Sequence, residues 1–391
     1  MSKQAVVGGD FGQLTDTASA FIEQNPLVLV VVALVVLLIL VVAFRNGTPR
    51  LRRPKGARFV KQLQKYDEVS VLMHPNPDPD AMACAAAVAF LADSVDTKAT
   101  LQYPGKIRHQ ENRAFETVLD LELQNIDNAS ELTSKNVVLV DHNVSRGFNG
   151  ASGITPFAVI DHHPGTGTGT QFTDCRTDYG ACSTILAEYL DQQGYEPHKE
   201  DETVEKPLPH ELATGLLYGI QADTKHLTKG CSAAEFQACS YLFAGVDEDA
   251  LDRIANPQVE GEVLKIKARA ITKCDVNPPF AVSDVGDVEI VDAIPQAADE
   301  LVRLEGVTAV VVLGSRNGTI HLSGRSRDDR VHMGKTLQEV VDNIPMSSAG
   351  GHARMGGGQL SVEHMEGIGP RKGLNRSELV DRLFDGMAGE L

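Results

Sequence analysis

The sequence is short of positive charge, has no paired-cysteine motif and has no internal repeat. Its 391 residues include 36 lysines and arginines against 53 acidic residues, for a formal net charge of −17. Because lysine and arginine hold nucleic-acid backbones, this balance argues against a general grip on DNA or RNA. The acidic residues are spread along the chain, as in proteins of a high-salt cytosol. The 6 cysteines form no C-x-x-C pair, which argues against a structural zinc site and for reduced thiols.

One long apolar run covers residues 27–44, where every side chain is apolar. This length is about the minimum for a helix that spans a bilayer. Acidic residues precede the run, and arginines and lysines are concentrated in residues 45–58 after it. The positive-inside bias therefore predicts a single-pass anchor in the cell membrane, with the rest of the chain in the cytoplasm. A cleaved signal peptide is the alternative, but its basic residues would precede the apolar run.

Strand and helix patterns alternate from residue 68 to residue 242, which predicts an α/β domain with a mostly parallel sheet flanked by helices. The strands are expected at 68–73, 136–140 and 157–160, and the helices at 58–66, 81–92, 180–193, 212–222 and 233–242.

After about Gly245 the pattern changes, and a smaller α+β domain is expected. A charged, helix-like stretch extends to about Cys274. Beyond it we expect strands at 280–284, 288–291, 307–313 and 318–323, a helix at 335–344 and a glycine-rich segment at 349–358.

Four short clusters of aspartate and histidine carry most of the chemical information. They are His74-x-x-x-Asp78-x-Asp80, Asp141-His142-Asn143, Asp161-His162-His163 and Asp223-Thr224. Three of them follow apolar runs, and strand ends at one edge of a parallel sheet converge on one crevice. So many carboxylates and imidazoles would repel each other unless cations lay between them. The sequence therefore predicts metal ions, and two of them.

The first cluster contains Pro75, Pro77 and Pro79, which exclude a regular helix and hold the backbone extended. An extended loop points Asp78 and Asp80 the same way, so that they can face two different metals, with His74 sharing the metal of Asp78. The alternative is an ordinary strand-to-helix turn in which Asp80 is an N-cap.

The third cluster places two histidines in sequence, which cannot both face one side. We therefore expect one of His162 and His163 to bind metal and the other to face substrate. Asp161 is expected to orient an imidazole.

The motifs resemble the DHH phosphoesterases, named for the tripeptide that is Asp161-His162-His163 here. The resemblance extends from about Glu68 onward, and its second half resembles the DHHA1 domain. It rests on H-x-N-P-D-x-D-A at 74–81, the strand-end Asp141, G-A-x-S-T at 180–184, G-I-x-x-D-T at 219–224, S-x-R-S at 323–326 and G-G-H at 350–352.

The resemblance implies two Mn²⁺ ions, with Mg²⁺ or Co²⁺ as alternatives. Mixed carboxylate and imidazole ligands suit Mn²⁺. Two such ions lower the pKa of a shared water and direct it at phosphorus. The implied ligands are His74, Asp78 and Asp141 for one ion, and Asp80, the bridging Asp141, His162 and Asp223 for the other.

The same resemblance implies where substrate binds. Asp141, His162 and His163 are the expected catalytic residues, with His163 either contacting the phosphate or protonating the leaving oxygen. In the second domain the expected substrate-binding residues are Arg325, Arg327, Gly350, Gly351 and His352, where the glycines allow close backbone approach.

The expected organisation combines these elements. It comprises an N-terminal segment at 1–26, a transmembrane helix at 27–44, a basic linker at 45–58, a DHH catalytic domain at 59–245, a helical linker at 246–279 and a DHHA1 substrate-binding domain at 280–391.

The expected function is that of a membrane-anchored, Mn²⁺-dependent phosphodiesterase of small nucleotides, and a homodimer is left open. The substrates to consider are short oligoribonucleotides, cyclic dinucleotides such as cyclic di-AMP, and 3′-phosphoadenosine 5′-phosphate. A single-strand exonuclease would need a long basic groove. A family II pyrophosphatase shares the first domain but ends in a lysine-rich domain rather than in G-G-H. An inactive nucleotide sensor tethered to the membrane is the third alternative.

Overall fold

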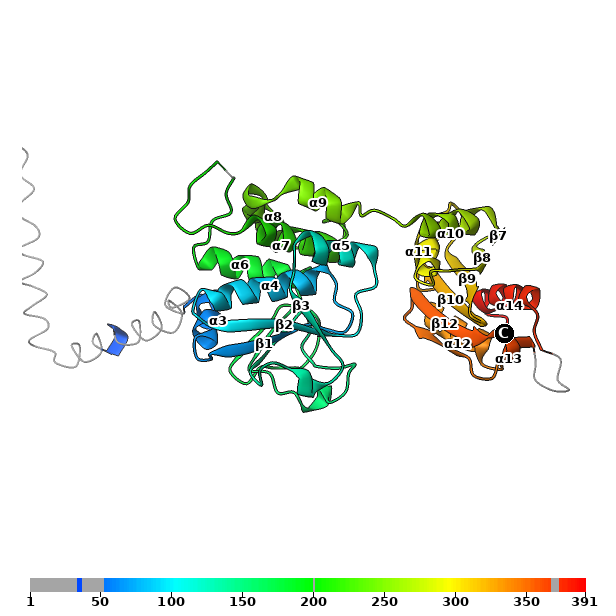
Figure 1. Ribbon diagram of the computed structural model, residues 1–391, viewed down its shortest axis with the longest axis horizontal. Coiled ribbons are helices and arrows are strands. Elements are labelled where there is room, and N and C mark those ends of the chain that lie inside the picture. The colour runs from blue at the N-terminus through cyan, green and yellow to red at the C-terminus, as the bar shows by residue number, and fades with distance from the viewer. Residues whose placement is uncertain (1–33, 37–52, 200, 367–372) are drawn as a thin grey trace, which may run out of the picture. The chain divides into compact units, whose positions relative to one another are not determined.

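The computed structural model describes residues 34–36, 53–199, 201–366 and 373–391 (Figure 1). The chain forms two compact units. The first comprises residues up to His74 with Asp80–Tyr103 and Ile126–Val246, and the second comprises Pro75–Pro79, Pro104–Asn125 and Asp247–Leu391.

One six-stranded sheet has the order β3-β2-β1-β4-β5-β6. Its strands are β1 (Glu68–Leu72), β2 (Lys98–Pro104), β3 (Leu123–Ile126), β4 (Val137–Val140), β5 (Ala158–Asp161) and β6 (Phe172–Cys175). The pairs β1–β2, β1–β4, β4–β5 and β5–β6 are parallel, as the sequence predicted. The strand order runs outward in both directions from β1 and β4. This pair is therefore the switch point, where sheets of this kind bind ligands.

Helices pack on this sheet and on each other. They are α3 (Lys55–Leu63), α4 (Pro79–Asp93), α6 (Cys182–Gln192), α7 (His210–Asp223) and α8 (Ala233–Leu242), with short 3-10 turns at Ala129–Glu131, Ala151–Gly153 and Phe243–Gly245. Helices α5 (Gln110–Val118) and α9 (Glu248–Ala255) belong to the second unit and pack against each other. The alanine-rich α4 is almost wholly buried, and α6 packs against α7 and α8. Helix α3 begins at Lys55, inside the stretch predicted as a linker, because Phe59 packs between the rings of Phe172 and Tyr189.

The second unit contains a mixed sheet in the order β11-β12-β10-β9-β8-β7. Only the β8–β9 pair is parallel among its pairs in the described residues. The elements are α10 (Gly261–Thr272), β7 (Cys274–Asn277), β8 (Phe280–Asp287), α11 (Ala293–Leu301), β9 (Ala309–Arg316), β10 (Thr319–Ser326), α12 (Met333–Val341), β11 (Ser348–Gly351), β12 (Met355–Ser361), α13 (Val362–Glu366) and α14 (Arg376–Ala388).

Helices cover both faces of the mixed sheet, because the side chains of β9 alternate between two apolar clusters. Val311 and Leu313 pack with α12 and α14. Val310 and Val312 pack with α10 and α11. This confirms a second domain that combines helices with a sheet.

One local prediction in this unit is wrong. Residues 288–291 form no strand; Val288 is buried in the loop that leads to α11, a helix that the sequence did not predict. The glycine-rich segment, for which the sequence predicted no secondary structure, contains the antiparallel strands β11 and β12. Glycine has a weak intrinsic preference for strands, and pairing with β10 overrides it here.

The predicted transmembrane helix at 27–44 lies outside the described residues, apart from the exposed helical residues 34–36. Within the described part of the chain, no helix is both long enough and apolar enough to cross a membrane. The anchor and the cytoplasmic location stay predictions.

Candidate metal centre

The predicted ligands come from the carboxyl ends of the central strands. His74 follows β1, Asp141 follows β4, and Asp161 is the last residue of β5, with His162 next to it. Asp223 is the last residue of α7. The sheet topology thus places the clusters at the switch point, as the sequence predicted.

These side chains form three groups in which the ligand atoms lie within 4.8 Å of one another. The groups are Asp141–His162–His163, His74–Asp78–Asp141 and Asp80–His162–Asp223. Asp78 and Asp80 therefore belong to different groups, and Asp141 belongs to two. The group His74–Asp78–Asp141 has the members predicted for one ion. Of the other predicted set, Asp80, His162 and Asp223 form a group without Asp141, which is grouped with His162 and His163 instead. The role of these residues in binding metal stays a prediction.

Asp141 is the centre of the arrangement. Asp141 is 2% exposed, and its backbone φ is 60°. Oδ2 lies 3.3 Å from Nε2 of His74, and Oδ1 lies 3.3 Å from Nε2 of His162. Both oxygens and Nε2 of His162 are buried and make no hydrogen bond within the described residues. Since buried polar atoms are nearly always paired, these orphaned ligand atoms fit a bound cation.

The electrostatics of these side chains favour positive charge at the centre. Burial, then the carboxylates of Asp141 and Asp223, raise the pKa of Asp80 well above its usual value. Burial alone would lower the pKa of His162, but the carboxylates of Asp141 and Asp223 raise it to about 12. The protonated imidazole of His162 thus supplies positive charge beside these carboxylates, as a bound cation would.

We expect Mn²⁺ binding near pH 8 to release protons, His162 supplying at least one, because a metal-bound imidazole must be neutral. With a pKa raised to about 12, ion-free His162 is protonated at that pH. Affinity should therefore rise with pH and fall as the solution becomes more acidic. Calorimetry in two buffers of different ionisation enthalpy measures the release. Equal binding enthalpies in both buffers would contradict it.

The carboxylate of Asp80 is held by backbone amides at the start of α6. The amide of Cys182 donates to Oδ2 at 2.6 Å, and the amide of Ser183 donates to Oδ1 at 2.8 Å. Because α4 begins at Pro79, Asp80 lies in its first turn and is no N-cap. The preceding loop is not extended throughout, since Asn76 has a φ of 56°.

The prediction that His162 and His163 face opposite sides is wrong. Their ring centroids lie 4.2 Å apart, and both rings approach Asp141. They differ in burial, since the side chain of His162 is 11% exposed and that of His163 is 51% exposed. The bend after β5 brings both rings to the same crevice.

Asp161 orients an imidazole, as predicted, and that imidazole is His163. Oδ1 of Asp161 accepts from Nδ1 of His163 at 3.0 Å and from the His162 amide at 2.8 Å. The hydrogen bond to Asp161 raises the pKa of His163. Asn143 donates to Oδ2 of Asp161 at 2.6 Å, a role that the sequence analysis missed.

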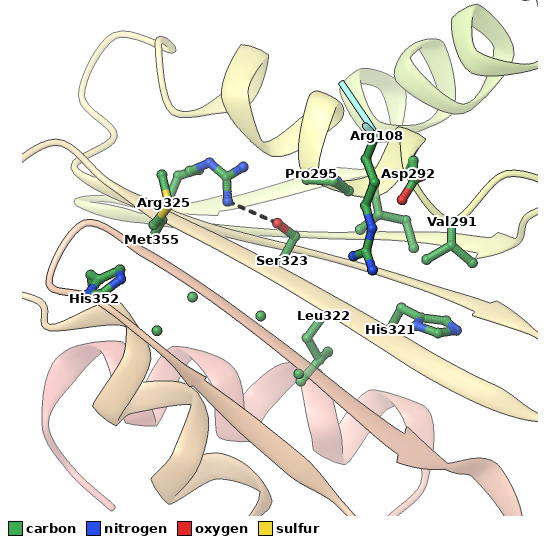
Figure 2. A pocket seen from close by; sticks show the side chains of 15 residues that line it. Arg108, Val291, Asp292, Pro295, His321, Leu322, Ser323, Arg325, His352 and Met355 are labelled. Atoms are coloured by element: carbon green, nitrogen blue, oxygen red, sulfur yellow. Dashed lines mark hydrogen bonds between the residues drawn. The ribbon is translucent and has the colours of Figure 1, made fainter. Parts of the chain in front are cut away.

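The second unit contains a cavity of about 360 Å³ (Figure 2). Its lining includes the predicted Arg325, Gly351 and His352. Arg327 and Gly350 are not among its lining residues. Arg108, which comes from the segment Pro104–Asn125 of the same unit, also lines it and was missed by the sequence analysis.

Arg325 is held in this cavity by a carboxylate that the sequence analysis did not single out. Its Nε donates to Oδ1 of Asp299 at 2.5 Å, and Nη2 donates to Oδ2 at 3.2 Å. Nη1 donates to Oγ of Ser323 at 3.1 Å, the bond drawn in Figure 2. The guanidinium is thus fixed at the cavity wall.

Known proteins resemble both units. The DHH family, N-terminal domain, matches residues 68–220, and the DHHA1 domain matches residues 277–368. An uncharacterised protein of Methanocaldococcus jannaschii is 29% identical over 334 residues, which are 82% of this chain and 65% of that protein. The cyclic-di-AMP phosphodiesterase GdpP of Geobacillus thermodenitrificans is 26% identical over 322 residues, which are 76% of this chain and 45% of GdpP. The chain thus spans less than two thirds of the length of each of these two relatives.

A solved structure shows the same fold. The exopolyphosphatase-related protein of Bacteroides fragilis superposes with a TM-score of 0.64 at 16% identity, over 86% of this chain and 96% of that protein. The likeness to this structure concerns the fold. The two matched domains show that the chain belongs to the DHH family of phosphoesterases, with a DHHA1 domain after its DHH domain.

Proposed function

We propose that this chain is a phosphodiesterase that hydrolyses small nucleotides at a centre of two divalent cations, Mn²⁺ first among them. The observation that carries the proposal is Asp141. Its two buried oxygens lack hydrogen bonds within the described residues and face His74 on one side and His162 on the other. When bound, two cations would activate water and neutralise charge on the phosphoryl oxygens.

The side chains of the centre have separate tasks in this proposal. Asp141 and His162 would bind the cations, and His163 would donate a proton to the leaving oxygen. Because Asp161 engages Nδ1 of His163, the Nε2 atom is left to donate to a leaving oxygen. The raised pKa of His163 favours the protonated form that this task needs.

Small substrates are favoured over long ones by charge and by cavity size. The net charge of −17 supplies no extended basic surface for a polynucleotide. A cavity of about 360 Å³ is in the range of small-molecule sites. Because Arg325 is paired with Asp299, Arg108 and His352 on the wall are the groups that suit an anion. GdpP is a phosphodiesterase of cyclic-di-AMP, which makes a cyclic dinucleotide one substrate to test beside short oligoribonucleotides and 3′-phosphoadenosine 5′-phosphate.

One hydrolysis panel with Mn²⁺ tests the proposal. It contains oligoribonucleotides of increasing length, cyclic di-AMP, 3′-phosphoadenosine 5′-phosphate and pyrophosphate. We expect turnover of at least one of the small phosphodiesters, and rates on oligoribonucleotides that fall beyond a few nucleotides. Turnover of 3′-phosphoadenosine 5′-phosphate alone would identify a phosphomonoesterase, because both of its phosphates are monoesters. Rates that rise with length would instead identify an exonuclease, and turnover of pyrophosphate alone would identify a pyrophosphatase. Nucleotide binding without turnover would identify a sensor.

A further inference from the structure

A short turn before α6 holds two members of the Asp80–His162–Asp223 group. The carbonyl oxygen of Tyr179 accepts from Nδ1 of His162 at 3.2 Å, which leaves Nε2 for the group. The amides of Cys182 and Ser183 hold both oxygens of Asp80. Any shift of this turn would therefore move a carboxylate and an imidazole of the same group together.

Gly180 fixes where the turn lies. A Cβ atom at this position would be 2.5 Å from the carbonyl oxygen of Gly230 and 2.9 Å from Cγ2 of Thr224. Thr224 follows Asp223, the third member of the group. The turn therefore packs directly against the end of α7, and only a glycine fits there.

Glu235 holds Gly180 from the first turn of α8. The residue is fully buried, and its Oε1 accepts from the Gly180 amide at 2.9 Å. Its Oε2 accepts from the amide and the hydroxyl of Ser232, at 2.5 and 2.8 Å, in a capping box. A capping box needs one oxygen of the carboxylate. The other oxygen is directed out of α8, at the turn that holds Asp80 and His162.

We propose that Glu235 is a positioning residue for the Asp80–His162–Asp223 group, acting through Gly180 and the turn from Tyr179 to Ser183. The inference rests on the proposed function, since it takes this group to bind a cation. The other group is supported elsewhere, because His74 follows β1 and Asp141 follows β4. Loss of Glu235 should therefore weaken one cation site and spare the other.

The test is a Mn²⁺ titration of the full chain, read by the electron paramagnetic resonance signal of free Mn²⁺. We expect Glu235→Ala to weaken the binding of one of the two ions by about 10-fold. This is the lower end of the cost of losing a group bonded directly to a ligand, because Glu235 acts on the ligands only through the turn. Glu235→Gln has one oxygen, which can accept from the Gly180 amide or from Ser232 but not from both. This variant should therefore bind that ion more tightly than Glu235→Ala but less tightly than the unaltered chain.

Ser232→Ala is the matched control, because it also damages the cap of α8 but leaves the bond from Gly180 to Glu235. It should lower the melting temperature as Glu235→Ala does and leave both Mn²⁺ affinities unchanged. Equal affinities in Glu235→Ala and Ser232→Ala, or equal weakening of both ions, would overturn the proposal. If Glu235→Ala does not fold, Glu235→Gln is compared with Ser232→Ala, and equal affinities there overturn it as well. Failure of the unaltered chain to bind Mn²⁺ would remove the proposed metal centre itself, and this inference with it.

Discussion

Asp141→Asn is expected to reduce hydrolysis by about 10³-fold or more, since loss of a single group that stabilises charge at a reacting centre costs about 10²- to 10³-fold and Asp141 serves both cation sites. The amide has nearly the shape of the carboxylate but lacks its charge and one of its two acceptor oxygens. Those oxygens face His74 and His162 at 3.3 Å. The measurement is the initial rate with saturating Mn²⁺, together with the number of ions bound.

The fold should survive this substitution, because asparagine tolerates a positive φ as well as aspartate does. Asp96→Asn is a matched control, since Asp96 has a φ of 59° and is exposed outside the centre. We expect it to leave both rate and metal content unchanged. Full activity of Asp141→Asn, with metal restored, would show that the proposed centre is not the catalytic one.

His163→Ala is expected to slow the hydrolysis of a nucleotide phosphodiester by about 10²- to 10⁴-fold, the usual contribution of a positioned general acid. A ribose hydroxyl is a poor leaving group until it is protonated. The half-exposed His163, oriented by Asp161 at 3.0 Å, is placed to supply that proton.

A substrate with a different leaving group distinguishes the two roles considered for His163, which are protonation of the leaving oxygen and contact with the phosphate. A bis(4-nitrophenyl) phosphate releases nitrophenolate, which needs no proton, so His163→Ala should slow that substrate far less than the nucleotide. Rates on both substrates, each as kcat and KM, measure the difference. Equal losses on both would assign His163 to phosphate binding instead.

The convergence of the clusters could be predicted because each central strand has a plain signature. β4 and β5 are short buried runs of apolar, mainly β-branched residues, and each meets an aspartate at its end. β2 and β6 lacked that signature, since their exposed positions carry residues such as Lys98 and Thr173. Only pairing with neighbouring strands identifies them.

The hydrogen-bond partners of the predicted ligands could not be predicted, because most of them are backbone groups. The contacts come from the amides of Cys182 and Ser183 and from the carbonyl of Tyr179. Residue type does not reveal them, because nearly every residue carries the same backbone groups. The signature from Ser232 to Glu235 predicts a capping box. Nothing in that spacing shows that the second oxygen of Glu235 reaches Gly180. Such contacts depend on how α6 and α8 pack.

The glycines of β12 give the cavity of the second unit a floor made of main chain. Gly356, Gly357 and Gly358 line it and pair in register with Gly324, Ser323 and Leu322 of β10. A surface without side chains has no rotamers to lose when something covers it. A flat ring that binds on this floor would therefore cause no change of side-chain conformation beneath it. Only the side chains around the rim would adjust to such a ligand.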